Sequence, residues 1–138
     1  MADYAGRLPV ATPESQPYWD GLKEHKLMLP TCDDCGPHFY PRPFCPMPKC
    51  FNWDIKWMQA SGKGKVYTFV ISHQPIPPYN TEDNAPPYVI AVIELEEGPR
   101  MMSNLIIDDP YSTTVDMDVE IVFDDVTDEV TLPKFKPV

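Results

Sequence analysis

The chain has 138 residues, of which 43% are hydrophobic and 12% aromatic, enough apolar material for one modest domain with a small appendage. No apolar run approaches the roughly 18 residues that span a bilayer, and the first ten residues lack a signal-peptide core, so we expect a cytoplasmic protein without membrane contact. The formal net charge is −10. A broadly acidic surface repels phosphate backbones, which disfavours nucleic acid as a partner.

Residues 1–31 are predicted to form an N-terminal helical arm. Thr12 or Ser15 can cap a short helix within residues 17–25. One face of this helix is aromatic and apolar, and it consists of Tyr18, Trp19, Leu22 and His25. So short a helix is not stable alone. Because little local core is available to cover, we expect this face to contact another subunit rather than the core of this chain.

All four cysteines of the chain lie between residues 32 and 50, in the order Cys32-x2-Cys35-x9-Cys45-x4-Cys50. Two close pairs joined by a short loop can place four thiolates around one tetrahedral zinc ion, and the many prolines around them forbid a helix. Residues 32–58 are therefore predicted to be a structural zinc ribbon whose folding energy comes from the metal and whose core is separate from the next domain. Two alternatives stay open: a pair of disulfides, or His38 as a ligand in place of one cysteine.

Residues 59–138 are predicted to form a small closed barrel. Trp53, Ile55 and Trp57 indicate a short strand that leaves the ribbon, and a turn follows at residues 61–64. Runs rich in β-branched and aromatic residues then predict five barrel strands, at 65–72, 88–95, 100–107, 119–123 and, more weakly, within 129–135. No helix is required between them, and closure removes the exposed edges of an open sheet.

The basic residues are concentrated in one stretch. From residue 42 to residue 65 a single acid, Asp54, stands among five bases: Arg42, Lys49, Lys56, Lys63 and Lys65. Such a patch can hold a small phosphorylated ligand or an acidic partner surface, although ordinary solvated charge is the alternative. His73 ends the first barrel strand and is the best candidate base, with a hydrogen bond to loop backbone as the alternative. We find no nucleophile–base pair, and no catalytic residue is predicted.

The order of these motifs resembles a known family, the acyl-CoA-associated OB-fold proteins with an N-terminal rubredoxin-like zinc ribbon. The resemblance covers nearly the whole chain from about residue 12 to residue 123. Its matching stretches are YWDGL at 18–22, CDDCG at 32–36, FYPRPFCP at 39–46, SGKGKVYTF at 61–69, PYVIAVIEL at 87–95 with Gly98, and MDVEIVF at 117–123. The chain departs from the family pattern at two places. Its second cysteine pair has four intervening residues instead of two, and it has Asp116 where family members commonly carry a glycine.

The resemblance implies a mainly β protein with a helical arm, a zinc ribbon and a five-stranded OB-fold barrel. It also implies an accessory subunit, non-catalytic or co-catalytic, of a thiolase-superfamily enzyme: a thiolase, an acyltransferase or the thiolase-like aldolases of steroid side-chain breakdown. Such a subunit bridges its partners and helps form the channel for acyl-CoA. Coenzyme A phosphates would then lie near Arg42, Lys49, Lys63, Lys65 and His73. The alternatives are a MaoC-like enoyl-CoA hydratase as partner, or an independent OB-fold binder of nucleic acid or another ligand.

Overall fold

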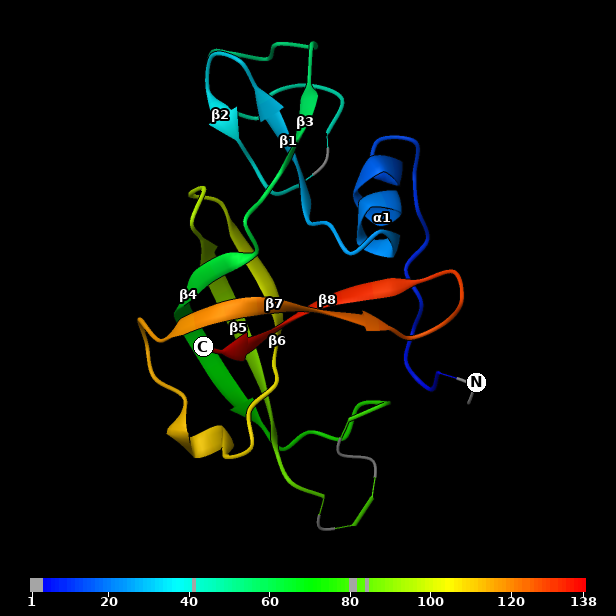
Figure 1. Cartoon of the computed structure of the whole chain (residues 1–138), viewed down its shortest axis with the longest axis vertical. Helices are drawn as coiled ribbons and strands as arrows, with labels where there is room; N and C mark the ends of the chain where they lie inside the picture. The colour runs from blue at the N-terminus through cyan, green and yellow to red at the C-terminus, as the bar shows by residue number, and fades with distance from the viewer. Residues whose placement is uncertain (1–3, 41, 80–81, 84) are drawn as a thin grey trace.

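The computed structural model describes residues 4–40, 42–79, 82–83 and 85–138, and within them the protein is mostly β-structure. A three-stranded antiparallel sheet lies at one end of the molecule, with helix α1 beside it, and a barrel lies below (Figure 1). The small sheet and the helix consist of α1 (Gln16–Lys23), β1 (Met28–Cys32), β2 (Gly36–Pro37) and β3 (Lys56–Gln59). The barrel and the 3-10 turn η1 consist of β4 (Lys63–Ser72), β5 (Tyr88–Leu95), β6 (Arg100–Leu105), η1 (Pro110–Ser112), β7 (Asp118–Asp125) and β8 (Thr131–Pro137).

The five-stranded barrel confirms the fold expected from the sequence. Its strands close in the order β4-β5-β6-β8-β7, with β7 paired back to β4. All its pairs are antiparallel except β6 with β8, which are parallel through Leu105 and Phe135. Strand β4 starts next to Gly62, whose φ of 80° is left-handed and where a side chain would meet the Ile121 side chain at 2.5 Å. Glycine is therefore required at this entrance to the barrel.

Two details of the predicted elements are wrong. Strand β3 begins only at Lys56, so Trp53 and Ile55 do not share a strand with Trp57. The Asn52 side chain accepts a hydrogen bond from the backbone N–H of Asp54, a local turn that competes with strand pairing. At the start of α1, Ser15 occupies the N-cap position but makes no capping bond, because its hydroxyl accepts from the Thr12 N–H instead.

Helix α1 packs on the core of its own chain, which corrects the expectation of a contact with another subunit. Tyr18 and Leu22 are buried and belong to one hydrophobic cluster with barrel residues such as Phe135. Leu27 and Leu29, at the entry to β1, belong to the same cluster. Each fully buried leucine contributes about 1.5–3 kcal/mol to folding. The ribbon and the barrel thus share a continuous core, and the expectation of separate cores is wrong.

The boundaries 1–31, 32–58 and 59–138 stay a prediction. Strand β1 crosses the first of these boundaries and β3 crosses the second. In the described part of the chain, no helix has the length and apolarity needed to cross a bilayer.

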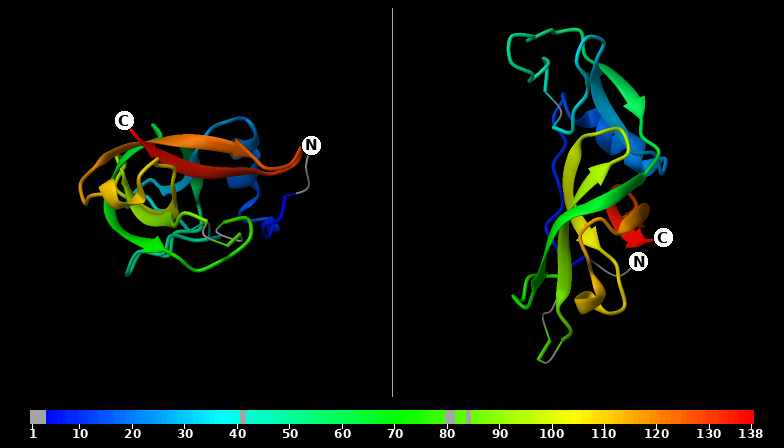
Figure 2. Two further views of the ribbon diagram at one scale, coloured as in Figure 1. Left: turned by 90° about the horizontal axis from the view of Figure 1, so that it is seen from below. Right: turned by 90° about the vertical axis from the view of Figure 1, so that its left-hand side faces the viewer.

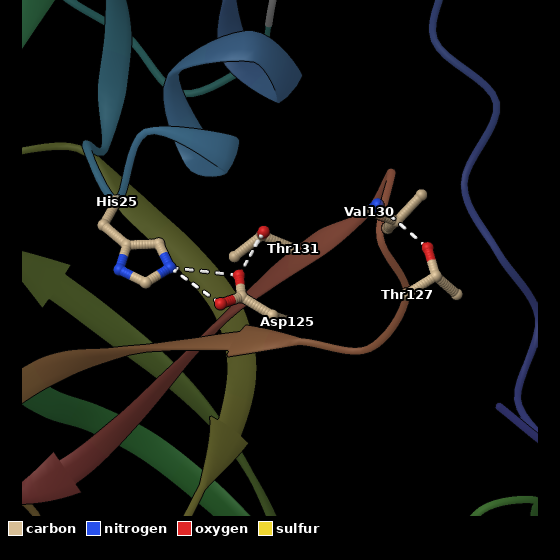
Figure 3. A network of polar contacts seen from close by, with 5 residues as sticks. All are labelled: His25, Asp125, Thr127, Val130 and Thr131. Carbon is tan, nitrogen blue, oxygen red and sulfur yellow. Dashed lines mark hydrogen bonds and ion pairs between the residues drawn. The ribbon is translucent and has the colours of Figure 1, made fainter. Parts of the chain in front are cut away.

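A polar contact ties the end of the helical arm to the β7–β8 hairpin (Figure 3). His25, at a left-handed φ of 56°, stacks on Phe123 with ring centroids 5.1 Å apart, and its Nε2 lies 3.0 Å from the Asp125 carboxylate. The Thr131 hydroxyl donates to the same carboxylate at 2.6 Å. The pKa of Asp125 is lowered most by the hydrogen bond from the Thr131 hydroxyl and next by the contact with His25. This contact links residues that are far apart in the sequence.

Replacing Asp125 with asparagine tests this contact. A carboxyl whose pKa is lower in the folded than in the unfolded chain stabilises the fold above its unfolded pKa of about 3.9, and that stability is lost as the pH falls through the folded pKa. We therefore expect Asp125→Asn to lower the urea midpoint at pH 6–7, and the difference from the parent to shrink below about pH 4. Asp128→Asn, on the same hairpin, is the control. An equal deficit at pH 3 and pH 7 would contradict an ionic origin.

Candidate metal centre

The four cysteine sulfurs converge on one point between the two loops of the ribbon. All four Sγ atoms lie within 4.8 Å of one another, and the Cys32 and Cys50 sulfurs are 3.8 Å apart. A tetrahedral zinc ion with Zn–S bonds of about 2.3 Å requires sulfurs about 3.8 Å apart, so the geometry fits this metal. A disulfide needs about 2.05 Å. The cysteines are free, which excludes the disulfide alternative for this structure.

The first loop has the usual form of a zinc knuckle. Cys35 is followed by Gly36 at a φ of 85°, a left-handed turn that glycine adopts without strain. Backbone N–H groups of Asp34 and Cys35 hydrogen-bond the Cys32 sulfur and lower the pKa of this thiol. Oriented N–H donors of this kind stabilise a thiolate and fix its direction before a metal binds.

The second loop absorbs its two extra residues by a turn. The Cys50 N–H donates to the Met47 carbonyl at 3.1 Å, and the Cys45 N–H donates to the Asn52 carbonyl at 2.7 Å, so the chain returns Cys50 to the cluster. Lys49 and Phe51 flank Cys50 with left-handed φ angles of 67° and 51°. Such angles cost non-glycine residues roughly 1–2 kcal/mol each. The longer loop therefore keeps the sulfur geometry at the expense of local strain.

Two of the four thiols, those of Cys35 and Cys45, resist ionisation. Contact with the Cys50 thiol, and then burial, raise the pKa of Cys35. The Met47 N–H lowers the pKa of Cys45, but burial and the neighbouring thiols outweigh it and the pKa is raised. A bound divalent cation would remove this repulsion and displace the protons. Zinc bound here would cross-link the two loops of the ribbon.

His38 does not belong to the sulfur cluster. Its side chain is buried, and its pKa is lowered first by this burial and then by the nearby Arg42 charge. Both ring nitrogens lack a hydrogen-bond partner within the described residues. The cysteines alone therefore form the candidate ligand set.

The structure does not bring the predicted phosphate-binding residues together. Lys63 and Lys65 lie at the start of β4, beside a surface hollow of about 380 Å³, where Lys65 binds Asp118 at 2.7 Å. Arg42 and Lys49 are exposed on the ribbon. The loop that begins with His73 lies at the opposite end of the molecule from the ribbon in two views (Figures 1 and 2). His73 itself contacts the Tyr111 hydroxyl through Nε2 at 3.2 Å.

An exposed aromatic cluster on the ribbon was missed at the level of the sequence. Phe44 lies 5.3 Å from Trp53 and 6.1 Å from Phe51, measured between ring centroids, and Trp53 is 71% exposed. We call Phe44, Phe51 and Trp53 the ribbon tip. Arg42 and Lys49 are close to it in sequence. The high frequency of aromatic residues between 44 and 53 could have indicated this cluster, but the sequence pattern predicts a strand that contains Trp53.

Two family models match consecutive parts of the chain. The rubredoxin-like zinc ribbon domain of ChsH2 matches residues 19–54, and the C-terminal OB-fold domain of ChsH2 matches residues 57–124. A DUF35 domain-containing scaffold protein of Methanocaldococcus jannaschii is 36% identical over 87% of this chain and 88% of its own length. The chain belongs to the DUF35 family. This membership confirms the resemblance seen in the motifs.

Two other relatives are named as subunits and are longer than this chain. A probable enoyl-CoA hydratase alpha subunit of Thermomonospora curvata is 31% identical over 94% of this chain. The 3-oxo-4,17-pregnadiene-20-carboxyl-CoA hydratase alpha subunit of Mycobacterium tuberculosis is 33% identical over 87% of it. This chain spans only 39% and 37% of the lengths of these two relatives.

Two solved structures are similar to the whole chain. The structure described as the Ltp2-ChsH2(DUF35) aldolase contains a chain that superposes with a TM-score of 0.81 at 30% identity, over 94% of this chain and 98% of that one. A DUF35 protein of unknown function from Sulfolobus solfataricus superposes with a TM-score of 0.64 at 16% identity, over 93% of this chain and 87% of that one, which shows the fold alone.

We expect Cys50→Ser to reduce bound zinc to far less than one ion per chain and to lower the thermal midpoint of the entire protein by at least about 6 °C. The barrel is destabilised as well, because Leu27 and Leu29 join the ribbon to its core. Metal analysis and calorimetry measure both effects. Asp34→Ser changes an exposed side chain in the first loop and is the matched control. An unchanged midpoint in a zinc-free Cys50→Ser protein would contradict a shared core.

Proposed function

We propose that this chain is an accessory, non-catalytic subunit of a thiolase-superfamily enzyme that acts on acyl-CoA thioesters, where it bridges subunits and helps to form the coenzyme A channel. The observation that carries the proposal is the similarity to the Ltp2-ChsH2(DUF35) aldolase, which extends over nearly the full length of both chains. A relative of the same size is called a scaffold protein, in keeping with a structural role.

The chemistry of the described side chains supports a scaffold rather than a catalyst. The four thiols are gathered as one ligand set. His25 lies against the Asp125 carboxylate and His73 against the Tyr111 hydroxyl, and neither of these two contacts is the pairing of a nucleophile with a base that acyl transfer uses. We expect the isolated chain to turn over no thioester.

Co-expression with the acyl-CoA enzyme encoded beside the gene tests the proposal. We expect the two chains to elute together in size-exclusion chromatography, and the enzyme to lose most of its turnover when this chain is omitted. Co-expression of the enzyme with the Cys50→Ser chain in place of the parent chain serves as the control for general effects of expression. Elution of the chain alone, together with unaltered turnover by the enzyme, would contradict the proposal.

A second candidate is the accessory subunit of an enoyl-CoA hydratase. The two longer relatives named as hydratase alpha subunits favour it. The two candidates are separated by assaying the purified complex for hydration of an enoyl-CoA and for cleavage of the carbon–carbon bond of a β-hydroxyacyl-CoA. An independent OB-fold ligand binder ranks third, because the net charge of −10 opposes binding of nucleic acid.

Within the proposed complex, coenzyme A phosphates would be held by the bases predicted from the sequence, with the largest share from the ribbon. Lys63 and Lys65 share their hollow with Glu94, Glu96 and Asp118, which offset their charge. Arg42 and Lys49, in contrast, are exposed and lie close in sequence to the ribbon tip. Aromatic rings next to cations suit an adenine ring with its phosphates.

Removing these two charges should therefore weaken substrate binding by the complex. We expect Arg42→Ala with Lys49→Ala to raise the KM for acyl-CoA by about three- to tenfold with little change in kcat, since the lost contacts hold a part of the substrate that does not react. Initial rates at varied acyl-CoA concentration measure this. Lys23→Ala with Lys26→Ala removes the same charge from the arm and should leave KM unchanged. A KM that rises equally in both pairs of substitutions, or that rises in neither, would contradict the assignment.

A further inference from the structure

Strand β5 is apolar on both of its faces. Its inward residues Val89, Ala91 and Ile93 are buried in the barrel. Because side chains alternate along a strand, Ile90 and Val92 point outward. Strands with one face in water normally carry polar residues there, and an apolar run on both faces is typical of a strand covered on both sides. In the described structure the inner side of β5 is covered by the core, whereas Ile90 and Val92 on its outer side are half-buried.

The neighbouring strands extend this apolar surface. The register places Val70 of β4 opposite Ile90, and Met102 of β6 opposite Val92. Side chains directly opposite each other lie about 4.5–5.5 Å apart between their Cβ atoms, so these four form one continuous patch. Val70 is 54% and Met102 is 68% exposed. We call Val70, Ile90, Val92 and Met102 the outer barrel face.

The charges around this face are mostly acidic. Glu94 lies near the end of β5, and Glu96 and Glu97 follow in the turn to β6. Two bases lie beside Glu94, and both are paired: Arg100 of β6 binds Glu94 at 2.8 Å and lies over the Tyr67 ring at 3.7 Å, and Lys65 of β4 binds Asp118 at 2.7 Å. On the loop before β5, Glu82 and Asp83 are exposed. A second copy of this chain would bring the same acids against these, in molecules that each carry a net charge of −10. The face therefore fits a different protein, one with basic residues around an apolar contact.

We infer that the outer barrel face is the docking surface for the enzyme subunit, through an apolar patch of that subunit bordered by lysine and arginine. This inference rests on the proposed function and deepens it by naming the contact surface. The ribbon tip has the opposite balance of charge, since two bases, Arg42 and Lys49, stand near it in sequence against one acid, Asp54. The two exposed apolar surfaces thus divide between a protein partner with basic margins at the barrel and an anionic ligand at the ribbon.

The test measures the affinity of the purified, zinc-loaded chain for the enzyme subunit encoded beside it, by surface plasmon resonance. Val70→Glu and Met102→Glu place a charge on the outer barrel face at positions that are already exposed. We expect each to weaken binding at least about 30-fold, because the carboxylate would be desolvated opposite an apolar patch. Met102→Leu and Val115→Glu, the latter at an exposed apolar position after η1, are expected to bind within about twofold of the parent. If the thermal midpoint of a glutamate variant falls, Met102→Ser is used in its place, because it removes the apolar contact without adding a charge.

Each result separates this inference from the function on which it rests. Absence of binding by the parent chain would overturn the proposed function and the inference with it. If the parent chain binds and Val70→Glu and Met102→Glu bind equally well, the inference alone would be overturned. The same holds if Trp53→Ser is the one variant that loses binding. Concentration-dependent dimers of the parent that disappear in Met102→Glu would show a second copy as the occupant and overturn it as well.

Discussion

The packing of Leu22, Leu27 and Leu29 against the barrel holds this molecule together as one unit. These side chains come from the helical arm and the first ribbon strand, yet they are fully or almost fully excluded from water in the same cluster as Phe135 of the last barrel strand. The stacked His25 ring and the Asp125 contact continue this junction at the surface. Because the two parts share their core, the orientation of the ribbon relative to the barrel is set by buried side chains rather than by a linker. A scaffold requires this property, since it must present its surfaces at fixed positions.

The sulfur cluster has a structural character throughout. The thiols face one another, their loops donate backbone N–H groups to them, and the longer second loop tolerates left-handed angles at Lys49 and Phe51 in order to return Cys50 to the cluster. Strain is retained where the surrounding structure over-determines it, and here the sulfur cluster on one side and the aromatic ribbon tip on the other constrain the loop. Under the proposed function, this chain contributes shape and charge, and the chemistry belongs to its partner.

The molecule exposes two unlike apolar surfaces at separate places. The ribbon tip is aromatic and bordered by bases, whereas the outer barrel face is aliphatic and bordered by acids. Exposed apolar patches on a highly charged protein are typical of interaction sites. A subunit that joins an anionic thioester to an enzyme needs one surface for each, and the opposite signs of charge keep the two from exchanging roles.

The sequence by itself determined the barrel, its five strands and the four-cysteine ribbon, because alternation of side chains and cysteine spacing are local patterns that geometry translates directly into structure. It also indicated Asp116 as a special position, and its φ of 65° is the left-handed turn that a glycine would supply. The docking of α1, the continuity of the core and the exposure of Trp53 were decided by the tertiary structure alone. The apolar face of a helix indicates that other residues must cover it, but only the placement of β1 and β8 beside α1 determines which residues these are. In the same way, only the register of β4 and β6 places Val70 and Met102 beside the outward residues of β5 on the surface.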